Sequence, residues 1–154
     1  MNKRTRSVCP VNLSSTYEYP HLIVPVNECN LNTALGNGHP LYPPCSNFDI
    51  PAFRAGKTSS LVFILPTKTQ QWWDQYTMSG AGAINVYKLP NPASTISTFN
   101  NIDAGELVGS VPNLTPGSVC TISSGPCTPR QKLGNRIDPL ETLTCSIFKI
   151  VIGC

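Results

Sequence analysis

Proline and glycine interrupt this sequence so often that no stretch free of both is longer than 13 residues. The 154 residues include 15 prolines and 11 glycines, and the two longest uninterrupted windows are 67–79 and 140–152. Proline breaks helices and glycine destabilises them, so long helices are excluded. The chain is therefore not a helical bundle or a coiled coil, and we expect short strands joined by turns.

Short apolar segments between turn residues predict where the strands lie. These segments are rich in Val, Ile, Leu and Phe, and Pro, Gly or Asn bounds them. The predicted strands are 22–26, 60–65, 83–89, 106–111, 119–123 and 145–152. Such a series predicts an all-β fold, specifically an antiparallel β-sandwich of jelly-roll-like topology. Pro25 lacks an N–H for the ladder, so its strand is expected at an edge or a bulge.

The chain length fits one domain. We expect a single β-sandwich domain over residues 17–154, preceded by an N-terminal arm over 1–16 for which a processed propeptide remnant is one interpretation. The segments 27–47 and 124–139 are rich in turn residues and are expected to be long loops pinned by disulfides.

Few residues carry charge: 12% are Asp, Glu, Lys or Arg, and the net charge is +3. This charge is too small for a nucleic-acid-binding surface. The longest apolar run, 61–65, is too short to cross a bilayer. We therefore expect no nucleic-acid partner, no membrane insertion and a monomeric protein.

Seven cysteines are scattered along the chain without the paired spacing of a zinc site. They are Cys9, Cys29, Cys45, Cys120, Cys127, Cys145 and Cys154. So many cysteines in a short chain favour an oxidising compartment, with three bridges and one thiol left over. Buried free thiols in a cytosolic protein are the alternative interpretation.

Several connectivities fit these positions. In one of them a turn at 123–126 joins Cys120 to Cys127. Cys29 then closes a loop with Cys45, Cys9 joins Cys154, and Cys145 stays free.

Secretion is also favoured by two N-glycosylation sequons, at Asn12 and Asn113. Residues 1–10 lack the apolar segment of a signal peptide, so we expect a mature chain whose leader has been removed. The predicted location is extracellular, in association with the cell wall as one possibility.

An aromatic segment at 70–76 is the strongest candidate for a binding site. Trp72, Trp73 and Tyr76, together with Asp74, combine flat rings with a polar rim. Such a surface stacks on sugars, and it also suits a protein partner. The structural alternative is that one tryptophan fills the open end of the sandwich while the other is exposed incidentally.

Four blocks of sequence, in order, resemble a known family. They are 19–26, 47–51, 55–58 with 60–63, and 76–84. They are similar to the C-terminal domain of the ubiquitin 3-binding protein (But-type) family, from about residue 17 to 124 with a weaker echo in the last strand. The resemblance implies a fungal source, a β-sandwich, a secretory leader in most members and no established active site.

The resemblance also has departures and a limit. Ser59 stands where relatives often have Cys, Trp72 and Trp73 replace a polar turn, and residues 128–144 match poorly. The family name reflects binding of one member to a subunit of a ubiquitin-like-protein activating enzyme. That partner is intracellular, which fits poorly with the cysteine content of this chain.

Catalytic motifs are missing from the sequence. A glycosidase needs two carboxylates facing each other across a sugar, and the acids lie mostly in predicted loops. His39 and Cys45 could form a nucleophilic pair only if the cysteine were not bridged. Asp49, before Ile50 and Pro51, is expected to be buried and hydrogen-bonded to a turn. We expect no metal or other cofactor.

These observations predict a non-enzymatic extracellular interaction protein acting through surface loops. Its role would be that of a cell-wall-associated factor or a host-directed effector or elicitor, with an unknown extracellular protein or a wall glycan as partner. The first alternative is a carbohydrate-binding module that uses the aromatic segment. The second is a hydrolase whose site is built from loops.

Overall fold

A computed structural model describes most of the chain. The described residues are 17–26, 31–37, 44–65, 67, 76–78, 80–140, 143–145 and 149–153. Within them the fold is all-β and every strand pair is antiparallel. The helical structure of this described part is one 3-10 turn, η1 (Ala52–Arg54), and no helix in it is long and apolar enough to span a bilayer.

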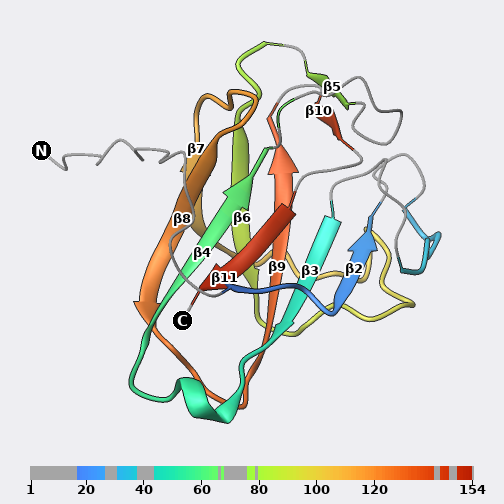
Figure 1. Cartoon of the computed structure of the whole chain (residues 1–154). Coiled ribbons are helices and arrows are strands. Elements are labelled where there is room, and N and C mark those ends of the chain that lie inside the picture. Colours follow the sequence, from blue (N-terminus) through green and yellow to red (C-terminus); the bar gives the residue numbers. More distant parts are fainter. Residues whose placement is uncertain are drawn as a thin grey trace, which may run out of the picture.

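The strands form two large sheets and one small one (Figure 1). The five-stranded sheet has the order β2 (Leu22–Pro25), β3 (Pro44–Asp49), β9 (Lys132–Pro139), β6 (Ile84–Leu89), β7 (Glu106–Val111). The four-stranded sheet has the order β1 (Tyr17–Glu18), β11 (Lys149–Gly153), β4 (Thr58–Ile64), β8 (Val119–Pro126). The small sheet pairs β10 (Leu143–Cys145) with β5 (Tyr76–Met78).

The two large sheets face each other and bury one hydrophobic core between them (Figure 1). Phe48 of β3, Ile84 of β6 and Ile137 of β9 supply one side of this core, and Leu61 and Phe63 of β4 supply part of the other. Alternate residues of a strand point to opposite faces, so each strand contributes every second side chain to the core.

Each predicted strand corresponds to strand structure. The segment 106–111 matches β7 residue for residue, whereas β8 continues three residues past the expected end at 123. The segment expected at 145–152 contains the last residue of β10 and most of β11. The prediction for Pro25 is confirmed, because β2 lies at the edge of its sheet.

The two segments predicted as long loops are the main error. Residues 27–47 include most of β3, and 124–139 include all of β9, and these strands pair in the interior of the five-stranded sheet. Both faces of β3 are buried, so Cys45, Ser46, Asn47 and Phe48 show no alternation of polar and apolar residues. Their Ser, Asn and Pro content indicated turns, and the pairing with neighbouring strands overrides that local preference.

Replacing Phe48 with alanine tests the location of the core. Phe48 is fully buried, so Phe48→Ala should lower the free energy of unfolding by about 3–5 kcal/mol. Phe53 of η1 is 72% exposed, with the Arg54 guanidinium 4.8 Å from its ring centre. Phe53→Ala removes the same atoms and should cost less than about 1 kcal/mol. Urea unfolding of both variants measures the difference, and equal losses would contradict the placement of the core.

Candidate functional site

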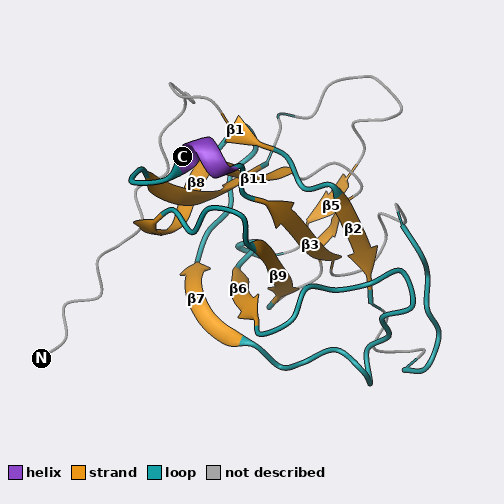
Figure 2. Ribbon diagram, turned by 90° about the horizontal axis from the view of Figure 1, so that it is seen from below, coloured by secondary structure: helices purple, strands orange, loops and turns teal. Residues whose placement is uncertain are grey.

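A long loop covers the outer face of the five-stranded sheet. This outer-face loop, residues 90–105, leaves β6, runs across the sheet and returns to β7 (Figure 2). Beneath it lies a second hydrophobic cluster, made of Val24, Val26, Cys45, Leu89 and Ala93 with Leu22 and Ile102 against it. The loop therefore gives the sheet a second buried face.

Asn47 of β3 holds the outer-face loop against the sheet. Its side-chain amide donates to the carbonyl oxygen of Ala93 at 2.6 Å, and its Oδ1 accepts from the Ala93 N–H at 3.0 Å. Asn47 is 3% exposed, so both polar groups of Ala93 are satisfied by one buried side chain. A buried asparagine pairing twice with one residue fixes both the position and the register of the loop.

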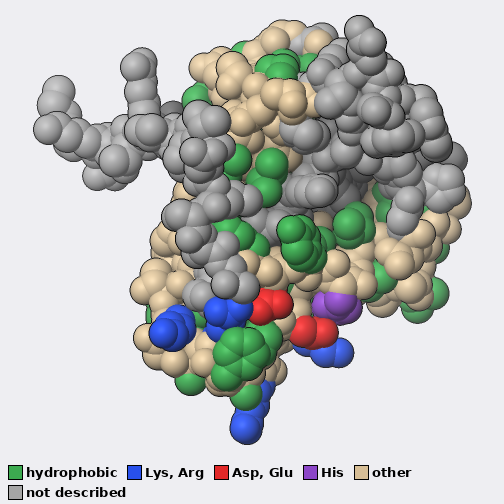
Figure 3. All heavy atoms as spheres, in the orientation of Figure 1, with side chains coloured by type: hydrophobic (Ala, Val, Ile, Leu, Met, Phe, Trp, Pro, Cys, Tyr) green, Lys and Arg blue, Asp and Glu red, His purple; other side chains and the backbone are tan. Residues whose placement is uncertain are grey.

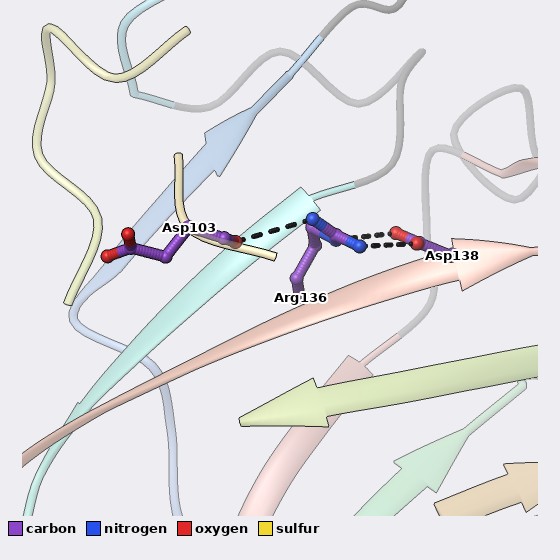
Figure 4. A network of polar contacts seen from close by, with 3 residues as sticks. All are labelled: Asp103, Arg136 and Asp138. Atoms are coloured by element: carbon purple, nitrogen blue, oxygen red, sulfur yellow. Dashed lines mark hydrogen bonds and ion pairs between the residues drawn. The ribbon is translucent and has the colours of Figure 1, made fainter. Parts of the chain in front are cut away.

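Arg136 of β9 provides a second point of attachment (Figure 4). Its guanidinium pairs with both carboxylate oxygens of Asp138, at 2.9 and 2.8 Å, and donates to the carbonyl oxygen of Asp103 at 3.4 Å. The Tyr87 ring lies below the guanidinium, with its centre 4.9 Å from the Arg136 Cζ. The Asp103 carboxylate points away and accepts a hydrogen bond from Asn91. Arg136 thus binds the backbone of the loop, while its charge is balanced by Asp138.

The tip of the outer-face loop is held by hydrogen bonds within the loop. The Ser94 N–H donates to Ser97 Oγ at 2.9 Å, and the Thr98 N–H donates to Asn101 Oδ1 at 2.7 Å. Asn101 Nδ2 donates to the Ile96 carbonyl oxygen at 3.3 Å. Short polar side chains that bond to nearby backbone groups stabilise such turns.

Three apolar side chains are exposed at this tip. Ile96 is 74% exposed, Phe99 39% and Leu31 43%. The Asn100 N–H donates to the Leu31 carbonyl oxygen at 3.0 Å, which brings the neighbouring segment alongside the loop. We call Leu31, Ile96 and Phe99 the loop surface. The sequence did not predict these residues as a site, because single apolar residues between turn residues form no periodic pattern.

A cavity of about 300 Å³ opens between the two large sheets. Leu61, Val108, Leu133 and Ile152 make it partly apolar, and Lys88 and Asn135 are among its polar residues. The remaining lining residues are Ser59, Ser123, Ser124, Gly125, Pro126 and Thr128. Ser59 Oγ donates to the Gly125 carbonyl oxygen at 3.2 Å, so β4 and β8 are joined at the rim. This mixed lining differs from the hydrophobic cluster beside it.

The cysteines correct two of the predicted pairings. Cys45 was expected in a disulfide, but it is a free thiol, fully buried beneath the outer-face loop. Burial raises the pKa of Cys45 to about 12, and nearby Arg136 offsets this only in part. This also removes Cys45 as a nucleophile, because the thiolate is the reactive form.

The other correction concerns Cys120 and Cys127. Each of them is disulfide-bonded, but they are too far apart to be bonded to each other. The turn expected at 123–126 is part of the extended strand β8. At about 3.3 Å per residue, seven steps separate the two cysteines by roughly 23 Å, and bridged Cα atoms lie within about 7 Å. The pairing of Cys120 with Cys127 is therefore wrong.

Much of the aromatic site predicted at 70–76 lies outside the described residues. Trp72, Trp73 and Asp74 belong to this group, and Tyr76 is described only as the first residue of β5, opposite Cys145. Cys9, Cys29, Cys154, Asn12 and His39 also lie outside the described residues. The roles proposed for all of these residues stay predictions. Asn113 is described and exposed, so its side chain is accessible for glycosylation.

The described carboxylates mostly serve structural contacts. Glu18 pairs with Arg54 at 3.0 Å, and Asp49 pairs with His21 Nδ1 at 3.2 Å. Asp49 is 56% exposed, so its expected burial is wrong. Figure 3 shows basic, acidic and histidine side chains gathered at the lower end of one face, in the region where Figure 1 draws η1.

Two carboxylates, Asp103 and Glu106, share one open depression beside Lys88. They come from the single segment 103–106, whereas glycosidase carboxylates flank the sugar from two sides. Among the described residues, no group of three or more His, Cys, Asp or Glu side chains could hold a metal ion.

A family model matches residues 18–149, which is most of the chain. The family is described as the ubiquitin 3 binding protein But2 C-terminal domain. This chain belongs to that family. The resemblance proposed from the four sequence blocks is confirmed. The match also includes residues 128–144, a segment that was judged to match the family poorly. Searches among curated proteins and among solved structures found no match.

In this But2 family domain, Asn47→Ala should release the outer-face loop. The substitution leaves the buried N–H and carbonyl of Ala93 without partners, and it should lower the free energy of unfolding by about 2–4 kcal/mol. Asn85 of β6 is the control. It donates no hydrogen bond to the loop, and its exposed Oδ1 accepts one from Ser110 Oγ at 2.7 Å. Asn85→Ala should cost less than about 1 kcal/mol. Hydrogen exchange of the Ala93 amide should accelerate in Asn47→Ala alone, and unchanged protection would contradict this account.

The Cys45 thiol of the domain should resist alkylation. With a pKa of about 12, roughly one thousandth of the thiol is ionised at pH 9, whereas an unfolded cysteine is mostly ionised there. The thiol therefore favours the folded state below about pH 8.5 and loses this contribution as the pH rises toward 12. Peptide mapping after iodoacetamide treatment should show label on Cys45 only in denaturant. Rapid labelling of the folded protein would show that the thiol is accessible.

Proposed function

We propose that this But2 family domain is a secreted, non-enzymatic interaction protein that binds an extracellular protein through the loop surface. The observation that carries this proposal is the presentation of Ile96 and Phe99 on a loop held by Asn47 and Arg136. A loop fixed before binding loses little conformational entropy when it meets a partner. Exposed apolar side chains on such a loop fit the buried centre of a protein interface.

The family description supports a protein as the partner. The member from which the family takes its description is a ubiquitin 3 binding protein. We propose protein binding as the shared property, with an extracellular partner here, in the role of a wall-associated factor or a host-directed effector or elicitor.

Secretion is proposed from the cysteine content and from the exposed sequon at Asn113. On this proposal the sheets form a jelly-roll-like sandwich whose loops are pinned by disulfides. The buried Cys45 thiol is compatible with an oxidising compartment, because the outer-face loop covers it.

The location can be measured with a tagged copy of the protein in its own organism. We expect the tagged protein in the culture fluid or the cell wall, carrying an N-glycan that Asn113→Gln removes. Recovery of all the protein from the cytosolic fraction, without a glycan, would refute secretion.

The loop surface can be tested with a photoreactive phenylalanine analogue placed at Ile96. Irradiation of wall and culture fractions should yield one discrete cross-linked protein. Leu140 is 59% exposed and lies just beyond β9, outside the outer-face loop, so the same analogue at Leu140 serves as the control. The Phe99→Ser substitution should reduce the cross-linked product from Ile96 at least about fivefold if the aromatic side chain is a hot spot. Equal products from both positions, or none from Ile96, would show that the loop surface is not the interface.

A further inference from the structure

A row of polar side chains crosses the inner face of the five-stranded sheet. In strand register Ser46 of β3 lies opposite Asn135 of β9, and Asn135 lies opposite Lys88 of β6. Along β6 the core residues Ile84 and Val86 alternate with outward-facing positions, and Lys88 continues their series. The alternation therefore directs Lys88 toward the space between the sheets, and this exposed residue is one of those that line the cavity.

The opposite wall of the cavity is polar for a separate reason. β8 contains a bulge between its pairs with Leu61 and Val62, where Ile122 has no partner. Ser123 pairs with Leu61 and Gly125 pairs with Ser59, so both follow the inward series of β4. An added Cβ at Gly125 would meet no atom within 4 Å. Hydroxyl groups and open space thus face Lys88 from the other sheet.

The cavity has an excess of positive charge and hydrogen-bond donors. Its lining residues include the Lys88 ammonium and the Asn135 amide, and none of them is acidic or histidine. Glu106 lies opposite Lys88 in register, but its side chain is exposed and no ion pair joins the two. Within the described part of the chain, Lys88 forms no ion pair with any residue.

One buried polar atom near this row is unsatisfied. Ser46 is 1% exposed, and its Oγ has no hydrogen-bond partner among the residues that the structure describes. Asn135, its neighbour in the row, is 5% exposed. Buried polar groups are normally paired, so a polar row that ends in an unpaired hydroxyl lowers the stability of the fold and calls for an explanation.

We propose that the inter-sheet cavity binds a small organic carboxylate. Lys88 and Asn135 bind the carboxylate head, and Leu61, Val108, Leu133 and Ile152 contact an apolar body. A volume of about 300 Å³ equals the space of roughly ten water molecules, which suits a ligand of about ten non-hydrogen atoms. This site is separate from the loop surface, so either proposal can fail without the other.

The test uses 4-fluorobenzoate as the probe and ¹⁹F NMR line broadening as the measurement. The folded protein should broaden the 4-fluorobenzoate signal and leave the neutral 4-fluorobenzamide sharper at the same concentration. Lys88→Met keeps the length of the side chain and removes its charge, and it should weaken 4-fluorobenzoate binding at least about tenfold. Lys132→Met is the matched control, because Lys132 is an exposed lysine of β9 outside the cavity lining, and it should bind like the original protein.

A second variant blocks the cavity from the other sheet. Gly125→Leu places a side chain in the open space and should abolish binding of 4-fluorobenzoate. Acetate shares the carboxylate but lacks the ring, so it should compete at least about tenfold more weakly than benzoate. Circular dichroism melting of each variant verifies the fold. No broadening by the folded protein, equal binding of the amide, or full binding by folded Lys88→Met would overturn the proposal.

Discussion

Strand β3, in the interior of the five-stranded sheet, is buried on both faces, and most of the described structure depends on this constraint. Its inner face meets the four-stranded sheet, and its outer face meets the outer-face loop. The loop has no regular secondary structure that would satisfy its own backbone, so Asn47 supplies buried hydrogen bonds at Ala93, and Arg136 adds an exposed hydrogen bond at Asp103. A sheet with one solvated face would need neither the loop nor these two side chains.

The same constraint explains how much of the fold the sequence could predict. Strands such as β4, β6 and β7 lie between turn residues and contain apolar runs, so their positions were predicted well. β3 and β9 carry polar residues on faces that other elements cover, and their composition resembles that of a loop. Asn47 is the clearest case, because an asparagine suggests a turn until its buried partner at Ala93 is known.

The candidate sites were harder to predict than the fold, because they depend on register. Lys88 on a short apolar strand suggests a solvated position, and the residue is exposed; only the pairing with Asn135 shows that it also lines the inter-sheet cavity. The loop surface depends on hydrogen bonds between residues three apart and on contact with a distant segment at Leu31. The aromatic segment was conspicuous in the sequence because tryptophan is rare, whereas these sites are assembled from common residues.

The bulge in β8 shows how a single residue can change the lining of a pocket in such a fold. One additional residue, Ile122, shifts every later side chain of the strand to the opposite face. If Ile122 were paired with Leu61 in an unbroken ladder, Ser124 and Pro126 would point inward in place of Ser123 and Gly125, and the proline ring would enter the opening. The way the ladder accommodates this single residue therefore decides which side chains of β8 face the interior, while the earlier part of the strand keeps its place in the hydrophobic centre of the domain.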